Sequence, residues 1–195
     1  KYLVPLLKGE KLGAFAVTEP SAGSDLGNQK TTAVDKGDYW LLNGAKIFIT
    51  NGFYADTYFV TAVTDKSQRN RGISAFIVEK GTPGFTFGTK EKKMGIRGSA
   101  TYELVFQDCK IPKENLLGEL GKGFKMALIT LDGGRIGVAA QALGIAQSAI
   151  DHCKKYVTEH MQGDQRISQY QFTQFELADM QTRVDAARLL VYRAA

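Results

Sequence analysis

The sequence predicts an α+β protein in which an antiparallel β-barrel or sandwich is followed by two long helices. Two observations predict this fold class. Up to about residue 115, short runs rich in valine, isoleucine, threonine and aromatic residues alternate with turn residues, as in strands. After Gly123 the apolar residues recur at helical spacing. The 195 residues are 44% hydrophobic and 23% charged, which is enough apolar material for a core.

About eight segments have the composition of strands. We expect them at residues 13–19, 29–34, 39–42, 46–50, 57–64, 73–79, 85–89 and 102–106. The Asn43-Gly44 pair predicts a two-residue type I′ hairpin between the third and fourth segments. No helical segment separates the strands, which favours antiparallel pairing. Pro112 ends the pattern because proline cannot donate to a strand ladder.

Two helices are predicted, the first from Phe124 to about Val157 and the second from about Gln169 to the end. The first is apolar on nearly every side between residues 136 and 150, which is typical of a helix buried in a larger assembly. The second repeats apolar residues three and four positions apart, as in a bundle seam, at Leu177, Met180, Val184, Ala187 and Val191. Two helices cannot bury these faces alone, so we expect partner helices.

Composition and charge exclude several classes of protein. No apolar run reaches the roughly 20 residues that span a bilayer, so we expect no membrane span. The net charge is +5, but basic residues are scattered apart from residues 90–93 and the pair Arg69 and Arg71. This pattern argues against nucleic-acid binding and leaves a preference for anionic ligands such as phosphates. Cys109 and Cys153 lack a CxxC or histidine-rich neighbourhood, so we expect no disulfide framework and no metal site.

The chain ends also carry information. Lys1 opens the chain without a signal-peptide pattern, and no glycine or proline follows the last predicted helix. We therefore expect an intracellular protein and a segment of a longer chain.

Three segments contain residues suited to chemistry. The first, FAVTEPSAGSD at residues 15–25, runs from a strand into a loop whose N–H groups and hydroxyls suit a phosphate or a polar ring edge. The alternative is a tight connection in which Ser and Asp side chains bond their own backbone. The second is KIFITNG at residues 46–52. Alternation there places Phe48 and Thr50 on one face and Ile47 and Ile49 on the other, so an aromatic and a hydroxyl could meet a flat ring.

The third segment is LDGGR at residues 131–135, inside the first helix. Asp132 and Arg135 would be costly in a buried helix unless they are paired or bind a ligand, and the two glycines leave room for another molecule. A structural Asp–Arg pair is the alternative. No GxSxG or HExxH motif is present. Glu19 is the nearest candidate for a general base, although its place before a proline favours a structural role.

These segments, in this order, resemble the acyl-CoA dehydrogenases, and most closely the short-chain (butyryl-CoA) branch. The resemblance covers KYLVPLLKGEKLGAFAVTEPSAGSD, KIFITNG, KKMGIRGSATYELVFQDCKIPKENLLGELGKGFK and LDGGRIGVAAQALGIAQ. It implies three parts: residues 1–12 as the end of an N-terminal helical domain, 13–117 as the middle β domain, and 118–195 as the first two helices of an incomplete C-terminal four-helix bundle.

The resemblance implies FAD-dependent α,β-dehydrogenation of short-chain acyl-CoA in fatty-acid β-oxidation, with electrons passing to electron-transfer flavoprotein. It also implies a homo-oligomer, a tetramer in this family, in the bacterial cytoplasm or mitochondrial matrix. The implied FAD contacts are Phe15, Val17, Thr18, Gly23, Ser24, Phe48, Ile49 and Thr50. The implied substrate contacts are Ser24, Asp132, Gly133, Gly134 and Arg135.

The chain also departs from the family pattern. The family's catalytic glutamate lies either in the last third of the protein or just before the arginine of the third segment, where this chain has Gly134. We therefore expect these residues to supply flavin and CoA contacts but no base, and the chain alone to be inactive. His160 and Gly163 replace an arginine and a phenylalanine that contact the FAD of a neighbouring subunit. Two alternatives remain: a binding or interaction module without redox chemistry, and an acyl-CoA oxidase.

Overall fold

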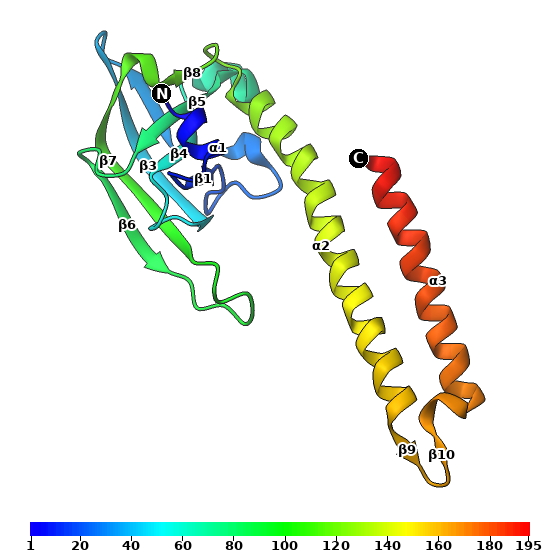
Figure 1. The fold of residues 1–195 in the computed structure, drawn as a ribbon. Helices are drawn as coiled ribbons and strands as arrows, with labels where there is room; N and C mark the ends of the chain where they lie inside the picture. Colours follow the sequence, from blue (N-terminus) through cyan, green and yellow to red (C-terminus); the bar gives the residue numbers. More distant parts are fainter. The chain divides into compact units, whose positions relative to one another are not determined.

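A computed structural model describes all 195 residues (Figure 1). They form two units, residues 1–128 and residues 129–195. The first unit contains a β-sheet, and the second contains most of one long helix and all of another. The predicted α+β fold, with a β domain followed by two long helices, is confirmed.

Eight strands form the sheet of the first unit, in the order β6-β7-β3-β2-β4-β5-β8 with β1 also paired to β4. Their bounds are β1 Gly13–Ala16, β2 Thr32–Asp35, β3 Tyr39–Thr50, β4 Thr57–Val63, β5 Ile73–Glu79, β6 Phe85–Lys90, β7 Thr101–Pro112 and β8 Leu116–Leu117. The predicted antiparallel pairing holds except at β4. There β1 pairs in parallel along residues 57–60, and β2 makes one parallel bridge at Val63.

The predicted hairpin at Asn43-Gly44 is wrong, because β3 runs through both residues as one 12-residue strand. Strand β3 pairs with β2 on one side and β7 on the other, and this long-range pairing overrides the local turn signal. A register shift against β7 lies between Leu42 and Gly44. At this bulge the side chain of Asn43 accepts a hydrogen bond from the amide of Asp108 at 2.8 Å. A Cβ atom on Gly44 would overlap Thr31, so glycine serves close packing here.

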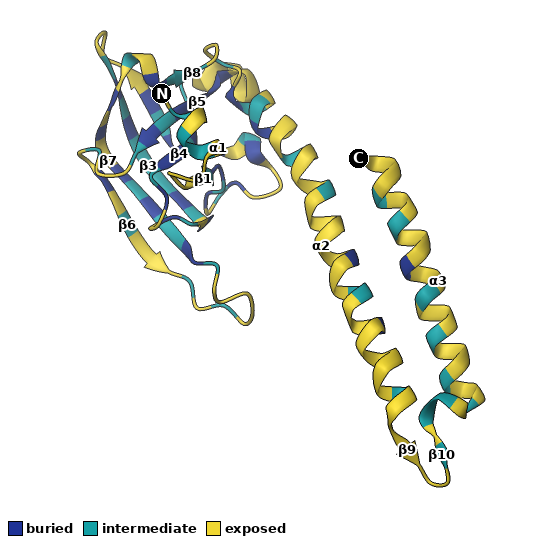
Figure 2. Cartoon of the chain, in the orientation of Figure 1, coloured by how far each residue is buried: buried dark blue, intermediate teal, exposed yellow.

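The core of the first unit is formed mainly by side chains of the strands. These buried residues are dark blue in Figure 2. Aromatic rings fill much of it: Phe85 packs on Phe106 and on Tyr58, with ring centroids 5.0 and 4.8 Å apart. Several buried side chains are polar, and one of them on a central strand is charged. Lys46, in the middle of β3, is completely buried.

Four short helices complete the first unit. Helix α1 (Leu3–Leu7) precedes the sheet, and Tyr2 beside it donates a hydrogen bond to Glu79 at 2.7 Å. The 3-10 helices η1 (Leu26–Asn28) and η2 (Lys66–Gly72) lie in the connections that follow β1 and β4. A third 3-10 helix, η3 (Lys113–Asn115), links β7 to β8.

The long helices are α2 (Gly123–Glu159) and α3 (Gln171–Ala194), close to the predicted bounds. A hairpin of β9 (Met161–Gln162) and β10 (Gln165–Arg166) and the 3-10 helix η4 (Ile167–Gln169) connect them. Leu143 and Ile150 of α2 pack against Val184 of α3.

The seam predicted for α3 is covered only in part within this chain. Val184 and Val191 are covered, but Met180 and Ala187 are exposed. The covered face of α3 includes polar side chains, since Arg188 donates a hydrogen bond to Gln147 of α2 at 2.6 Å. Large apolar residues elsewhere on the helices, such as Val138, Ile145 and Leu189, are exposed. The partner helices therefore stay a prediction. Neither long helix, nor any other, is apolar enough over a sufficient length to cross a membrane.

Candidate cofactor and substrate site

The loop after β1 is a tight connection that leaves one side open. Glu19 and Ala22 exchange two backbone hydrogen bonds of 3.0 Å. Ser21 donates its hydroxyl to the carbonyl of Asn28, and Asp25 accepts from the amide of Gly27. The alternative of side chains bonded to their own backbone is thus correct for part of the loop. The hydroxyls of Thr18 and Ser24 make no hydrogen bond within the protein, and Ser24 is exposed.

The second segment, at the end of β3, contains a strained aromatic residue. Phe48 is 59% exposed and has a φ of 58°. A left-handed conformation costs a bulky L-residue roughly 1–2 kcal/mol. Such strain gathers at functional sites, because only the surrounding structure can hold it. Thr50 is also exposed, so Phe48 and Thr50 both lie on the open face as predicted.

The predicted alternation of the other two residues is wrong. Ile49 is 2% exposed, whereas Ile47 is only partly buried. The reason is a second bulge: β7 pairs with Lys46 and next with Ile49, so Ile47 and Phe48 have no partner on β7. One extra residue in the strand shifts the side on which the following residues lie.

The structure brings the first two segments together. The amide of Ile47 donates a hydrogen bond of 2.9 Å to the carbonyl of Thr18. Thr18 therefore lies beside the bulge that contains Phe48. An exposed aromatic ring and unpaired hydroxyls at Thr18 and Thr50 form a surface suited to a flat ligand with polar edges.

Beneath this surface lies a buried ion pair between Glu19 and Lys46. The Nζ atom of Lys46 is 2.7 Å from Oε1 of Glu19, and both side chains are almost fully buried. Nζ also donates to Oε1 of Gln29 at 2.9 Å and to the carbonyl of Val17 at 3.3 Å. Glu19 in turn accepts hydrogen bonds from the amides of Lys30 and Thr31.

The pair determines the protonation of both groups. Burial alone would raise the pKa of Glu19, but the charge and hydrogen bond of Lys46 outweigh it and lower that pKa. Burial lowers the pKa of Lys46 to about 8, against the opposing effect of Glu19. Glu19 is thus committed to Lys46 and to backbone amides, which confirms a structural role and excludes it as a free base. Sequence reasoning missed Lys46, because nothing local distinguishes it from a solvated lysine.

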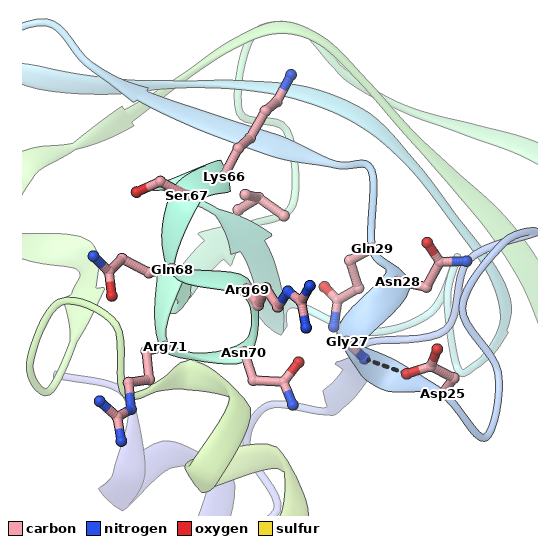
Figure 3. A pocket seen from close by; sticks show the side chains of 11 residues that line it. Asp25, Gly27, Asn28, Gln29, Lys66, Ser67, Gln68, Arg69, Asn70 and Arg71 are labelled. Carbon is pink, nitrogen blue, oxygen red and sulfur yellow. Dashed lines mark hydrogen bonds between the residues drawn. The ribbon is translucent and has the colours of Figure 1, made fainter.

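A basic pocket of about 800 Å³ lies beside the loop, between η1 and η2. Figure 3 shows Arg69 and Asn70 directed toward the segment Gly27–Gln29. The sequence singled out Arg69 and Arg71 only as a basic pair on a solvated loop. The pocket itself could not be foreseen, because its two walls are some 40 residues apart in the chain.

Matches to two domains of one protein family decide the family of this chain. Residues 14–109 match the family described as acyl-CoA dehydrogenase, middle domain, and residues 121–195 match acyl-CoA dehydrogenase, C-terminal domain. The chain belongs to the acyl-CoA dehydrogenase family. This agrees with the resemblance of the motifs.

Similar proteins of the acyl-CoA dehydrogenase family match throughout the chain. A short-chain specific acyl-CoA dehydrogenase of Megasphaera elsdenii is 59% identical over 100% of this chain and 51% of its own length. The butyryl-CoA dehydrogenase structure from that organism has a TM-score of 0.97, with 58% identity over 100% of this chain and 51% of its own. A chain in a structure described as the electron transferring flavoprotein of Acidaminococcus fermentans has a TM-score of 0.95, with 61% identity over 98% of this chain and 50% of its own. The chain spans about half the length of these relatives.

Within the acyl-CoA dehydrogenase motifs, some residues can contribute only backbone groups. Val17 and Ile49 are buried, whereas Phe15 is partly exposed and stacks on Phe59 with ring centroids 4.9 Å apart. The side chains open to a ligand are those of Thr18, Ser24, Phe48 and Thr50. Gly23 is exposed as well.

The third segment is exposed on α2 in this chain, and its burial against partner helices stays a prediction. Asp132 and Arg135 do pair, with Oδ1 and Nε 3.8 Å apart, but their side chains are 77% and 80% exposed. Such surface pairs contribute little to stability, with a median of about 0–1 kcal/mol. A Cβ atom on Gly133 or Gly134 would meet nothing within 4 Å. No group of histidine, cysteine, aspartate or glutamate side chains is placed to hold a metal ion.

Proposed function

We propose that the protein oxidises short-chain acyl-CoA thioesters at the α,β-carbons, with FAD as cofactor and electron-transfer flavoprotein as electron acceptor. The observation that carries this proposal is the juxtaposition of Thr18 with the strained, exposed Phe48, joined through the Ile47–Thr18 hydrogen bond. Membership of the acyl-CoA dehydrogenase family and the short-chain specific relative support the substrate class.

The open residues fit a flavin. Phe48 offers a flat apolar surface, and the hydroxyls of Thr18 and Thr50 are free to hydrogen-bond a polar ring edge. Such donors stabilise negative charge that develops on a ring during reduction. Bound FAD would supply the acceptor for the hydride that leaves the β-carbon. The exposed Gly23 and Ser24 would contact the phosphate groups of the cofactor.

The basic pocket fits the phosphorylated end of coenzyme A. Arg69, Lys66 and Arg71 bring positive charge to its walls, and Asn70 adds an amide. Guanidinium groups bind phosphate through paired, charge-assisted hydrogen bonds. Ser24 precedes the pocket residue Asp25 in the same loop. By the family match, Asp132 to Arg135 are also proposed as substrate contacts.

These residues bind and orient, but they do not remove the α-proton. Glu19 is engaged with Lys46, and Gly134 stands where some family branches have the base. A positioned base contributes roughly 10²–10⁴-fold to a rate. We therefore propose that the 195 residues alone do not turn over, and that a glutamate elsewhere in the complete protein acts as base.

Electron-transfer flavoprotein is supported as partner by the A. fermentans structure, whose matched chain is 61% identical. A homo-oligomer is supported by the large apolar side chains exposed on α2 and α3, which a second copy could cover.

The spectrum of the purified full-length protein tests the proposal. We expect the absorption of oxidised flavin, which should bleach when butyryl-CoA is added without oxygen. Colour should return with electron-transfer flavoprotein and only slowly in air. Rapid reoxidation by air would indicate an oxidase instead. A colourless protein that takes up no added FAD would contradict the proposal and favour an interaction module.

A further inference from the structure

Most of the direct connection between the two proposed flavin segments depends on one lysine. Three hydrogen bonds join residues 15–25 to strand β3: one from the amide of Ile47 to Thr18, and two from Nζ of Lys46, to Val17 and to Glu19. Lys46 therefore supplies two of the three. Strands β1 and β3 are not paired in the sheet, so no ladder substitutes for these bonds.

The same lysine lies at the point where β3 loses its support from β7. The ladder passes from the pair Lys46–Leu104 to the pair Ile49–Tyr102, which leaves Ile47 and Phe48 outside it. The left-handed backbone of Phe48 must then be held from the loop side. Lys46 is the last residue in register before this gap.

The network continues from the ion pair to the wall of the basic pocket. Gln29 accepts hydrogen bonds from Lys46 and from the hydroxyl of Thr61, and its own amide donates to Leu26 in η1. Gln29 also lines the pocket. One buried cation thus connects the loop, the strand and the segment between η1 and β2.

A buried ion pair is a poor device for stability alone. Removing two charges from water costs several kcal/mol per ion, and well-packed apolar side chains often stabilise a fold equally well. Its geometric demand is strict, however, because each charge must keep its hydrogen bonds. An ion pair with such strict geometry is suited to fixing the distance between two binding segments.

We infer that Lys46 and Glu19 form a positioning pair that holds the Thr18 loop and the Phe48 bulge at the spacing flavin binding requires. Neither residue touches the cofactor, so both act through the segments they join. The inference rests on the proposed function, since it concerns the same cofactor.

Titration of the flavin-free full-length protein with FAD, followed by flavin fluorescence, tests the inference. The variants are Lys46→Met, Glu19→Gln and both together. We expect each single variant to weaken FAD binding at least about tenfold. Because the pair acts as a unit, the double variant should bind FAD at least as tightly as the single variant with the lower affinity.

The matched control is Ile111→Ala, a core cavity at the opposite end of the β3–β7 ladder, where Ile111 pairs with Trp40. It should lower the melting temperature but change FAD affinity less than twofold. Equal effects of Lys46→Met and Ile111→Ala on affinity, at an equal loss of melting temperature, would overturn the inference. If Lys46→Met does not fold, Glu19→Gln, which keeps the side-chain shape, gives the same comparison.

A separate result would overturn the proposed function. If the unmodified protein binds no FAD, the function itself is wrong. If the unmodified protein binds FAD and the two variants bind it as well as the control does, only the positioning role is wrong.

Discussion

The side chain of Asn70 lies directly over Gly27, and a Cβ atom at position 27 would overlap its Oδ1 atom. Both residues line the basic pocket, Gly27 from η1 and Asn70 from η2. The missing side chain at position 27 keeps the Asn70 amide in the pocket wall.

Gly27→Ala should therefore affect ligand binding more than folding. The clash falls on the end of a side chain that can rotate, so we expect a stability loss below about 1 kcal/mol. Rotation would move the Asn70 amide out of place and weaken CoA binding several-fold, as measured by calorimetry. Gly98→Ala, where a Cβ atom meets nothing within 4 Å, is the control. Unchanged CoA affinity in Gly27→Ala would show that the pocket does not hold CoA.

Arg69→Ala should weaken binding of CoA thioesters about fivefold to tenfold, because a charge-assisted hydrogen bond to phosphate is lost. The same variant should bind an acyl-pantetheine, which lacks the nucleotide phosphates, as well as the unmodified protein does. Lys36→Ala, which removes a basic residue from an exposed turn, serves as control. Equal weakening for both ligands would place Arg69 away from the phosphates.

Phe48→Gly should separate stability from binding. Glycine relieves the positive φ, and the lost side chain is more exposed than buried, so we expect unchanged or slightly higher stability in urea unfolding. Affinity for FAD should fall at least about tenfold, because the ring surface is gone. Phe53→Ala, another exposed aromatic nearby in sequence, is the comparison. A clear stability loss in Phe48→Gly would mean that the ring packs on the protein rather than on a ligand.

Lys46→Met should destabilise the fold by about 3–5 kcal/mol at neutral pH, since it leaves Glu19 buried with a charge and no partner. Adding Glu19→Gln should recover part of that loss. Urea unfolding of the three variants measures both effects. A double variant less stable than Lys46→Met would contradict this account.

Acid should weaken the protein through the same pair. The pKa of Glu19 is lower in the folded than in the unfolded state, so the unfolded chain takes up its proton first as the pH falls. The contribution of Glu19 is therefore complete above about pH 4.5, its ordinary pKa, and is lost as the pH falls through the folded-state value. Glu19→Gln should show a flatter loss of unfolding free energy below that pH.

Local patterns predicted the elements well where neighbours in sequence decide the structure. The helices α2 and α3 and most strands follow from residue spacing and composition. The Asn43-Gly44 signal failed because β2 and β7 flank that part of β3, and their pairing outweighs a turn preference. Residue spacing also gave no indication of the bulge at Phe48.

The site was predictable in its motifs but not in its support. Thr18, Ser24, Phe48 and Thr50 could be selected from the sequence, and the structure leaves all four side chains open to a ligand. The Lys46–Glu19 pair could not be selected from the sequence, because its members lie 27 residues apart and meet only after the loop folds onto β3. Asp132 and Arg135 were placed on the correct helix, but their exposure depends on contacts that residue spacing does not describe.

The bulge at Phe48 also governs how β3 tolerates changes in length. Before it, even-numbered positions such as Trp40, Leu42 and Lys46 are buried, and after it the odd-numbered Ile49 is buried. Deleting Phe48 would place Ile49 two positions after Lys46, so plain alternation would keep Ile49 inward and Thr50 outward without the bulge. The extra residue therefore adds an exposed aromatic ring to the edge of the strand while the side chains that follow keep their places in the core and on the surface.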